Sequence, residues 1–244
     1  MILPTMNDDE KVFEVVRMSD WLCGICNDLH EQVVEKFKKG TRFPYFQRYC
    51  ATDDKNNLWT ILFYVKNKEM KKKKMFGTLA YITYDVPRKR KENDLNAGKG
   101  VLFFDPFSMS DMLHKKPVKR PSAVYDVVPH AFNRYTQRYL KPKGLEGIEF
   151  AKKFENMMVR WQWFDISADL FGDKNAEKHA NDGLCPYDVV MNGGGLLRGF
   201  IVNEMLVRFN TYIDNDSMFD NQIERQSKMV SEYYQMKRTG DIEY

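Results

Sequence analysis

The feature that most constrains the fold is a series of aromatic and β-branched runs between residues 42 and 106. Four runs alternate with polar or glycine-containing stretches, which is typical of short strands joined by turns. In one of them Trp59, Ile61 and Phe63 occupy every second position, so they share one face of a strand. The runs predict an antiparallel meander of about four strands, at 42–51, 58–65, 75–84 and 101–104.

Helical periodicity occurs on both sides of this meander. Apolar residues recur at helical spacing over 19–39, where Ser19 is the expected N-cap. Proline suits the first turn of a helix, so Pro129 is expected to begin a helix that ends near Leu140. Two more helices are predicted, over 145–164 and over 217–238.

Shorter apolar runs return after residue 185 and predict a second, small antiparallel sheet. Gly193–Gly195 supplies the turn between its first two strands, because glycine adopts backbone conformations that are closed to other residues. Helices and antiparallel strands in separate stretches of the chain predict an α+β fold. The strands of this second sheet are expected at 187–191, 196–202 and 205–213.

A polar stretch that contains three prolines, residues 106–121, separates the two groups of elements. Segments of this composition are typical of boundaries that few contacts cross, so we expect a linker here. The predicted organisation is an N-terminal helix plus meander over 1–105 and a C-terminal unit over 122–244. In the C-terminal unit two helices are expected to pack on the small sheet, and a last helix follows.

Composition argues against several classes of protein. The chain has no run of 18 or more apolar residues, so no membrane-spanning helix and no membrane partner are expected. The first ten residues are acidic and lack the basic-then-apolar order of a secretion signal. Four cysteines in 244 residues do not suggest a secreted disulfide scaffold. A cytoplasmic location is therefore expected.

The distribution of charge is more informative than the net charge of +4. Basic residues form three blocks, at 71–74, 88–91 and 115–120, all in the first half of the chain. Such blocks can bind a polyanion by releasing its condensed counterions, which makes nucleic acid a candidate partner. The alternative is that they are solvated hairpin tips and linkers.

The most informative stretch is the helix expected after Pro129. His130, Arg134 and Arg138 follow one another at intervals of four residues, so they lie along one side of that helix. A histidine can move a proton near neutral pH, and arginines can hold a phosphate and stabilise developing charge. This combination is what phosphodiester cleavage requires. The alternative interpretation is a solvated basic edge with a histidine that caps or packs.

The sequence His130-Ala131 followed by Arg134 and Arg138 resembles the His-Ala-x-x-Arg-x-x-x-Arg helix of small prokaryotic domains near the RelE- and BrnT-like toxins. Those toxins belong to the barnase–EndoU–colicin–RelE grouping of metal-independent ribonucleases. The resemblance covers residues 122–214, where a second helix and a small antiparallel sheet follow in the same order. It implies a RelE- or barnase-like unit.

In that grouping a basic or hydroxyl residue on a late strand completes the site. Carried over by position, the resemblance implies a catalytic role for Arg198 and Thr211 beside His130, Arg134 and Arg138. The substrate-binding residues expected from the same segment are Tyr135, Arg208 and Tyr212, and the tyrosines could stack on bases.

If the resemblance holds, the 2′-OH of RNA is the nucleophile and the product is a 2′,3′-cyclic phosphate. No metal and no cofactor are expected. The implied partners are RNA and an antitoxin or inhibitor protein. The alternative function is a non-catalytic phage or mobile-element accessory protein that binds nucleic acid or a protein. The sequence does not determine the oligomeric state.

A second group of metal-ligating residue types lies in the first predicted helix. Cys23, Cys26 and His30 can share one face of that helix. A structural zinc site needs a fourth ligand, whereas Cys50 and Cys185 stand alone in the sequence. We therefore expect these cysteines to be small buried hydrophobic residues.

Overall fold

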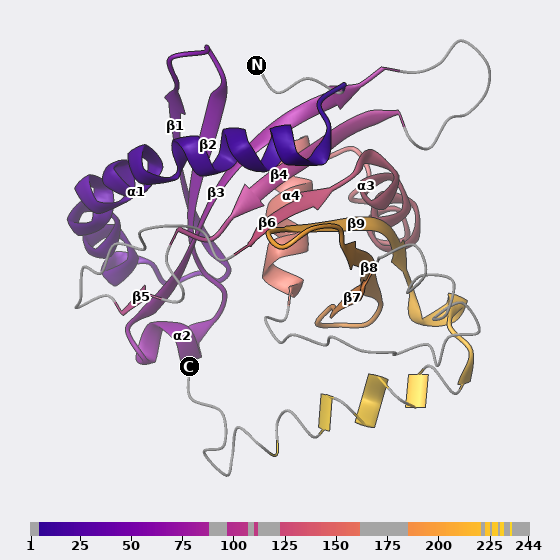
Figure 1. Ribbon diagram of the computed structural model, residues 1–244. Helices are drawn as coiled ribbons and strands as arrows, with labels where there is room; N and C mark the ends of the chain where they lie inside the picture. Colours follow the sequence, from indigo (N-terminus) through magenta and orange to yellow (C-terminus); the bar gives the residue numbers. More distant parts are fainter. Residues whose placement is uncertain are drawn as a thin grey trace. The chain divides into compact units, whose positions relative to one another are not determined.

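The structure is a computed structural model that describes residues 5–87, 97–106, 110–111, 123–161, 185–220, 223–224, 226–228, 230–231 and 235. Helices and antiparallel strands both occur, which confirms the predicted α+β class (Figure 1). The chain divides into two compact units, each built from separated segments. Unit 1 comprises 1–87, 99–126 and 204–206, and unit 2 comprises 88–98, 127–203 and 207–244.

Unit 1 contains the predicted meander. Strands β1, β2 and β3 pair antiparallel in sequence order, β4 and β6 continue that order, and β5 pairs with β3. The expected strands are all present. The elements of unit 1 are α1 (Asp8–Lys39), β1 (Tyr45–Thr52), β2 (Leu58–Val65), α2 (Lys68–Lys72), β3 (Met75–Val86), β4 (Gly98–Phe104), β5 (Ser110–Asp111) and β6 (Val124–Val127). The first residue of β4 and the last residue of β6 belong to unit 2.

Helix α1 begins eleven residues before the expected start at Ser19. Asn7 is the N-cap, and its side chain accepts a hydrogen bond from the Glu10 backbone N–H at 2.9 Å. The Glu10 carboxylate accepts from the Asn7 N–H at 2.8 Å in return, which completes a capping box. Ser19 is buried inside the helix, where its hydroxyl donates to the carbonyl of Val16. The expectation that Ser19 caps the helix was therefore wrong.

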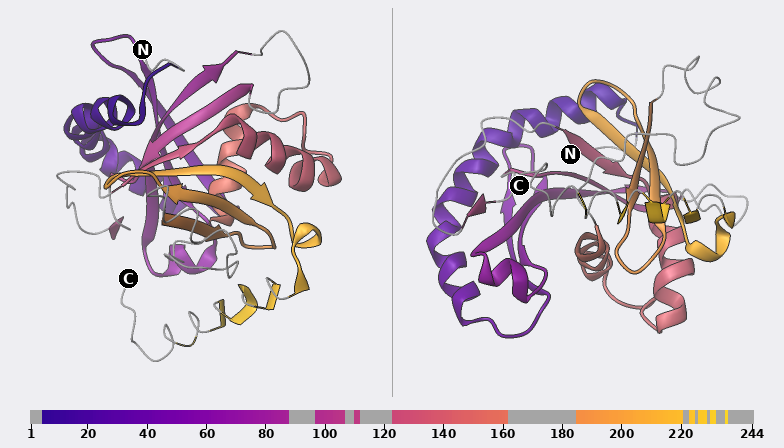
Figure 2. Two further views of the ribbon diagram at one scale, coloured as in Figure 1. Left: turned by 45° about the vertical axis from the view of Figure 1, so that its right-hand side comes forward. Right: turned by 90° about the horizontal axis from the view of Figure 1, so that it is seen from below.

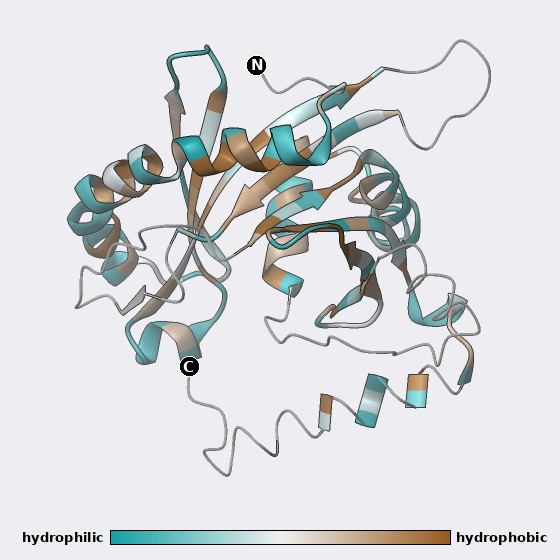
Figure 3. Cartoon of the chain, viewed as in Figure 1, coloured by the Kyte–Doolittle hydropathy of each residue, from teal (hydrophilic) through white to brown (hydrophobic). Residues whose placement is uncertain are grey.

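One face of α1 packs against aromatic side chains of the strands. The Phe76 ring of β3 lies 5.8 Å from that of Phe37 in α1 and 6.0 Å from that of Phe63 in β2. Trp59 and Leu22 are fully buried in the same unit. Figure 2 shows α1 curving around the strands, and Figure 3 shows apolar residues concentrated on the strands. Burying each large apolar side chain contributes roughly 2–3 kcal/mol, so this contact stabilises unit 1.

Unit 2 contains the strands expected after residue 185 and the helices expected before them, but these strands do not form the separate second sheet that the sequence predicted. Strands β7, β8 and β9 pair antiparallel, with β8 in the centre. The helix expected from Pro129 to Leu140 is present as α3 and a π-helical turn, whereas the next helix begins at Phe150 and not at 145. The elements are α3 (Pro129–Tyr135), η1 (Thr136–Leu140), the 3-10 turn η2 (Lys141–Lys143), α4 (Phe150–Arg160), β7 (Cys185–Val190), β8 (Leu196–Ile201), β9 (Leu206–Ile213) and the 3-10 turn η3 (Asn215–Ser217). The first residue of β9 belongs to unit 1.

A β-bulge sets the faces of β9. Phe209 pairs with Gly199, but the next pair joins Thr211 to Arg198, so Asn210 is an extra residue in β9. Phe209 and Tyr212 both contact residues of the helical layer: Phe209 packs on Trp161 at 5.0 Å and Tyr212 on Tyr135 at 5.2 Å. The face of β8 and β9 that carries Tyr212 is therefore the face covered by α3 and α4.

Several predicted segments lie outside the described residues. They include the end of the helix expected at 145–164, most of the expected linker at 106–121 and the basic blocks at 88–91 and 115–120. Of the expected helix at 217–238, the described residues from Asp220 onward are helical. Among the described residues, no helix is both long enough and apolar enough to cross a membrane.

Candidate functional site

The helical ridge of His130, Arg134 and Arg138 is formed by α3 and η1 in unit 2. All three side chains are half-buried. The Arg134 Nε lies 3.5 Å from His130 Nε2, at the long limit of a hydrogen bond. Because an arginine N–H can only donate, a hydrogen bond here would use an Nε2 atom that carries no proton. The first two residues of the predicted motif are therefore adjacent in space.

Arg138 at the other end of the ridge has acidic and carbonyl partners. Its Nη1 lies 3.5 Å from Asp214 Oδ1, just after the end of β9, and donates to the backbone carbonyl of Tyr212 at 3.3 Å. The ion pair is partly exposed, and its main consequence is to fix η1 beside the end of β9. Arg138 is thus oriented by β9 and does not contact His130 through any described bond.

The strand residues expected in the same site lie on the other face of the sheet. Arg198 pairs in register with Thr211, and their neighbours Leu197 and Tyr212 form the next pair. Successive side chains alternate between faces, and Tyr212 faces α3. Arg198 and Thr211 therefore face away from α3. This corrects the expectation that they complete a site with the ridge.

Arg208 follows the same geometry. It pairs with Phe200, next to the Phe209–Gly199 pair, and Phe209 faces α4 and Trp161. Its side chain therefore also faces away from the helices. The expectation that Arg208 binds substrate beside the ridge is corrected for the same reason as that for Arg198.

Tyr135 and Tyr212 are core residues. The two residues are 0% and 1% exposed, and their rings meet edge to face. The Tyr135 hydroxyl donates to Asn156 Oδ1 of α4 at 2.6 Å. A buried ring offers no free face to a base, which argues against the stacking role expected for both tyrosines.

A buried arginine, Arg160, organises this aromatic core. The Cζ atom of its guanidinium lies 3.4 Å from the ring centroid of Tyr139, 5.6 Å from that of Tyr135 and 5.8 Å from that of Tyr212. Its Nε donates to the Asn192 carbonyl at 2.9 Å, and its Nη2 donates to the Gly194 carbonyl. Arg160 thus joins the end of α4 to the turn between β7 and β8 by cation–π contacts and hydrogen bonds.

The turn itself requires glycine. Gly193, Gly194 and Gly195 all have positive φ, between 82° and 100°. A Cβ atom on Gly195 would lie 2.3 Å from the Tyr212 hydroxyl, and the Gly195 N–H donates to Asn215 Oδ1 at 2.7 Å. Burial raises the pKa of Tyr212 above its usual value, although the nearby Arg160 opposes this. The turn is a structural element held by side chains from several parts of unit 2.

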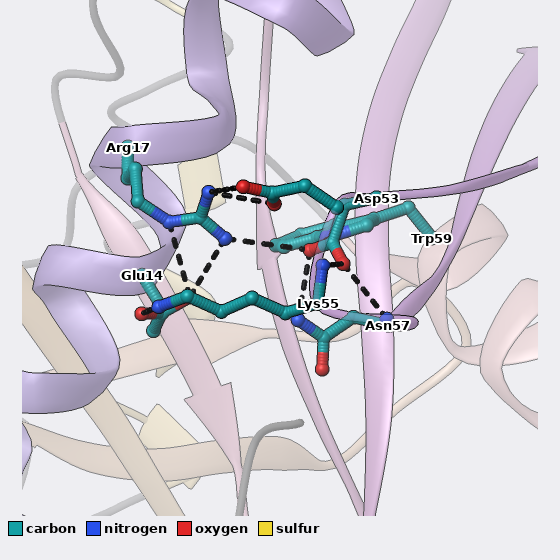
Figure 4. Close-up of polar contacts among 7 residues, drawn as sticks. Glu14, Arg17, Asp53, Lys55, Asn57 and Trp59 are labelled. Atoms are coloured by element: carbon teal, nitrogen blue, oxygen red, sulfur yellow. Dashed lines mark hydrogen bonds and ion pairs between the residues drawn. The ribbon is translucent and has the colours of Figure 1, made fainter.

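Unit 1 has its own polar cluster where α1 meets the β1–β2 hairpin (Figure 4). The Arg17 guanidinium lies 3.0 Å from Glu14 Oε2, 2.8 Å from Asp54 Oδ1 and 3.6 Å from Asp53 Oδ2. The Lys55 ammonium contacts the other Glu14 oxygen. These ion pairs connect the helix to the hairpin at residues that are distant in sequence.

Asp53 is the centre of this cluster. Its side chain is buried and accepts from both the N–H and the side-chain amide of Asn57, from the Trp59 indole at 3.1 Å and from the Lys55 N–H. Burial alone would raise its pKa, but these hydrogen bonds lower the pKa below its ordinary value. Glu14 has a lowered pKa in the same way, because the donors Lys55 and Arg17 outweigh its burial. Every oxygen is engaged, so the cluster is best interpreted as structural.

A third polar group joins three elements of unit 1. Asp126 of β6 is fully buried, accepts from the Tyr84 hydroxyl at 2.6 Å and pairs with the Lys11 ammonium at 3.1 Å. The Lys11 ammonium also lies 4.8 Å from the Tyr84 ring centroid. The three side chains satisfy one another, which is the usual condition for burying a charge.

The cysteine pair of α1 is buried. Burial raises the pKa of Cys23 to about 11, and it raises that of Cys26 further. His30 packs beside the Phe76 ring at 5.7 Å. In the part of the chain that the structure describes, no group of three His, Cys, Asp or Glu residues is placed to hold a metal ion. The expected role of the cysteines as buried hydrophobic residues agrees with this environment.

Sequence reasoning missed two residues that shape the ridge. Asp214, which pairs with Arg138, follows a strand directly, and a carboxylate at a strand end is too common to be a signal. Arg160 precedes Trp161, a member of the expected apolar stripe, so its burial could have been suspected from its position near a hydrophobic face.

Comparison of the chain with protein-family models, with curated proteins and with solved structures returned no match.

Proposed function

We propose that unit 2 is a metal-independent ribonuclease in which His130 is the base and Arg134 binds the scissile phosphate. The observation that carries the proposal is the contact between Arg134 Nε and His130 Nε2 at 3.5 Å, in two side chains that both retain partial exposure. A neutral imidazole is the form that can accept a proton, and an adjacent guanidinium supplies several more N–H donors for a phosphate.

The reaction uses the nucleophile of RNA itself. His130 Nε2 takes the proton of the 2′-OH once Arg134 has shifted its donors onto the non-bridging phosphate oxygens. O2′ then attacks phosphorus, the P–O5′ bond breaks, and O5′ takes a proton from water. Arg134 stabilises the negative charge that builds on the phosphate in the transition state. The products are a 2′,3′-cyclic phosphate and a 5′-hydroxyl end.

Arg138 has a positioning role in this proposal. Its partners Asp214 and the Tyr212 carbonyl hold η1 against the end of β9. The π-helical turn at 136–140 lies directly after Arg134 and Tyr135, and such turns occur frequently at functional sites. Arg198, Thr211 and Arg208 have no part in it, because they face away from α3.

The test is cleavage of a fluorophore–quencher RNA in the presence of EDTA. We expect the wild-type chain to cleave it, and His130→Ala to lose roughly 10²–10⁴-fold of the rate, which is the range for a general base. Arg134→Ala should lose roughly 10²–10³-fold. The matched control is Gln137→Ala, an exposed residue of the same helical segment, which should retain full activity.

Two results would overturn the ribonuclease proposal. One is a wild-type chain that leaves RNA intact. The other is a His130→Ala variant that cleaves as fast as the wild type, because the activity would then reside elsewhere or in a contaminant. A substrate with a 2′-deoxy sugar at the cleaved position should also resist cleavage, since it lacks the nucleophile.

The alternative is a non-catalytic phage or mobile-element accessory protein that binds nucleic acid or a protein partner. It predicts no cleavage in the wild-type chain, so the same assay separates the two functions. An antitoxin-like inhibitor would be a partner only under the first function, and it would be expected to cover His130.

A further inference from the structure

Basic residues gather at one end of unit 1. The segments 31–42 and 66–74, which contain the end of α1 and the whole of α2, have ten basic and three acidic residues. Their net charge is +7, whereas that of the whole chain is +4. We call this set the lysine surface; it consists of Lys36, Lys38, Lys39, Arg42, Lys66, Lys68, Lys71, Lys72, Lys73 and Lys74.

A side chain of the set brings the two segments together. The Lys71 ammonium of α2 donates to the carbonyl of Lys38 at 3.0 Å and to the carbonyl of Gly40. These carbonyls lie at the C-terminal end of α1, where the helix leaves acceptors without intrahelical partners. Lys71 therefore caps α1 from α2, and the basic residues of both elements belong to one region of unit 1 (Figure 1).

Most of the remaining charges face solvent. Lys38, Lys72 and Lys74 are exposed, as are five others of the set. Lys39 pairs with Glu35 at 2.7 Å and Lys73 with Glu69 at 4.0 Å, but all four side chains are more than half exposed. Exposed pairs of this kind contribute about 0–1 kcal/mol, so a stronger anion can replace the carboxylates.

We propose that the lysine surface binds the phosphodiester backbone of a nucleic acid, without reading its sequence. Like charges at this density attract a layer of counterions, and a polyanion gains affinity by exchanging its own counterions for the lysines. Nine of the ten residues are lysines, which act as point charges. Bidentate recognition of a base edge prefers arginine, so this composition favours contact with the backbone.

The apolar side chains favour nucleic acid over an anionic membrane. A helix that binds a membrane surface inserts an apolar face beneath its basic residues. Helix α2 has five residues and no buried one, and Met70 is only half exposed. The large apolar side chains exposed in the described part of the chain are Phe13, Trp21, Leu58 and Phe219, and none belongs to the lysine surface.

The inference goes beyond the ribonuclease proposal and does not depend on it, because all its residues belong to unit 1. The test measures binding of a labelled single-stranded RNA by fluorescence anisotropy between about 50 and 200 mM salt. All proteins carry His130→Ala, so that the RNA stays intact if the ribonuclease proposal is correct. The test variant is Lys38→Gln/Lys68→Gln/Lys72→Gln, which removes three exposed charges but leaves Lys71 in place.

The matched control removes three charges from unit 2, as Lys141→Gln/Lys152→Gln/Lys228→Gln at residues that are also exposed. Each lost phosphate contact lowers the slope of log affinity against log salt by about 0.7 for a single strand, so the test variant should lose about 2 from that slope. We expect its affinity at the lowest salt to fall at least about tenfold, and the control to match the parent within about twofold.

Three outcomes would overturn the proposal: a parent protein that does not bind RNA at low salt, equal slopes for test variant and control, or loss of binding to vesicles that contain phosphatidylserine without loss of RNA binding. The last outcome would assign the surface to membranes. If the wild-type chain fails to cleave RNA but the test variant shows a reduced salt slope, the ribonuclease proposal fails and the proposal for the lysine surface stands.

Discussion

The two units hold an arginine at a junction between elements in different ways. Arg17 in unit 1 is surrounded by the carboxylates of Glu14, Asp53 and Asp54. Arg160 in unit 2 is 5% exposed and forms no ion pair with a carboxylate among the described residues; carbonyl oxygens and three tyrosine rings surround it instead. The first arrangement depends on ionised acids, and the second depends on dipoles and ring quadrupoles that persist at low pH.

The largest effect is expected from Arg160→Met. The substitution keeps an apolar stem but leaves the Asn192 and Gly194 carbonyls without their donor, at a cost of about 4 kcal/mol in the free energy of unfolding. Urea denaturation measures the loss in the free energy of unfolding, and hydrogen exchange should show the lost protection in β7 and β8. The control Lys152→Met changes an exposed residue of the same helix and should stay within about 0.5 kcal/mol. Equal loss in both variants would mean that the aromatic cluster contributes nothing specific.

A smaller loss, about 3 kcal/mol, is expected from Asp53→Ala in unit 1. The variant leaves the Trp59 indole and the donors of Asn57 without their acceptor. Hydrogen exchange should show lost protection in the β1–β2 hairpin. The adjacent variant Asp54→Ala is the matched control, since Asp54 is exposed and should cost at most about 1 kcal/mol. If both variants lose the same stability, the buried hydrogen bonds of Asp53 contribute no more than the exposed ion pair of Asp54.

The smallest effect is a difference in pH dependence between the units. Asp53 and Glu14 have lowered pKa values, so their contribution is complete above the unfolded pKa near pH 4 and is lost as pH falls through the folded values. Tyr135 and Tyr212 have pKa values raised by burial, so their contribution is complete below about pH 10 and is lost as pH rises further. Unit 1 should therefore lose stability in acid, whereas the two tyrosines of unit 2 respond only in alkali, where the buried Cys23 and Cys26 of unit 1 respond as well.

Buried tryptophans allow the two units to be followed separately. Trp59 lies in unit 1 and Trp161 in unit 2. Variants that retain only one of them, with phenylalanine at the other tryptophan positions, report unfolding of each unit by fluorescence as pH changes. Coincident acid transitions in both variants would contradict the separation inferred from the two clusters.

The regular part of the fold could be predicted because hydrophobic periodicity is local. The alternation of Trp59, Ile61 and Phe63 was sufficient to locate β2. The start of α1 was missed because Lys11 and Glu14 are buried polar residues that interrupt the apolar pattern between Asn7 and Ser19. The capping signal Asn7-x-x-Glu10 was nevertheless present in the sequence.

The candidate site was only partly predictable, because side-chain direction in β9 depends on one extra residue. Strict alternation from Phe209 would direct Thr211 toward the helices. The bulge at Asn210 directs Tyr212 there instead and turns Thr211 away together with its partner Arg198. A pairing register of this kind is set by distant strands, whereas the spacing of His130 and Arg134 is set within a single helix and was predicted.

The discontinuous composition of unit 1 has a consequence for synthesis on the ribosome. The amide of Val124 donates to the carbonyl of Met205 at 2.7 Å, and residues 204–206 belong to unit 1 although most of unit 2 precedes them in the chain. The emerging polypeptide therefore delivers the last piece of unit 1 after α3 and α4 of unit 2 have left the exit tunnel. Until then the N-terminal end of β6 lacks this hydrogen bond, so unit 1 of the nascent chain stays incomplete through most of translation.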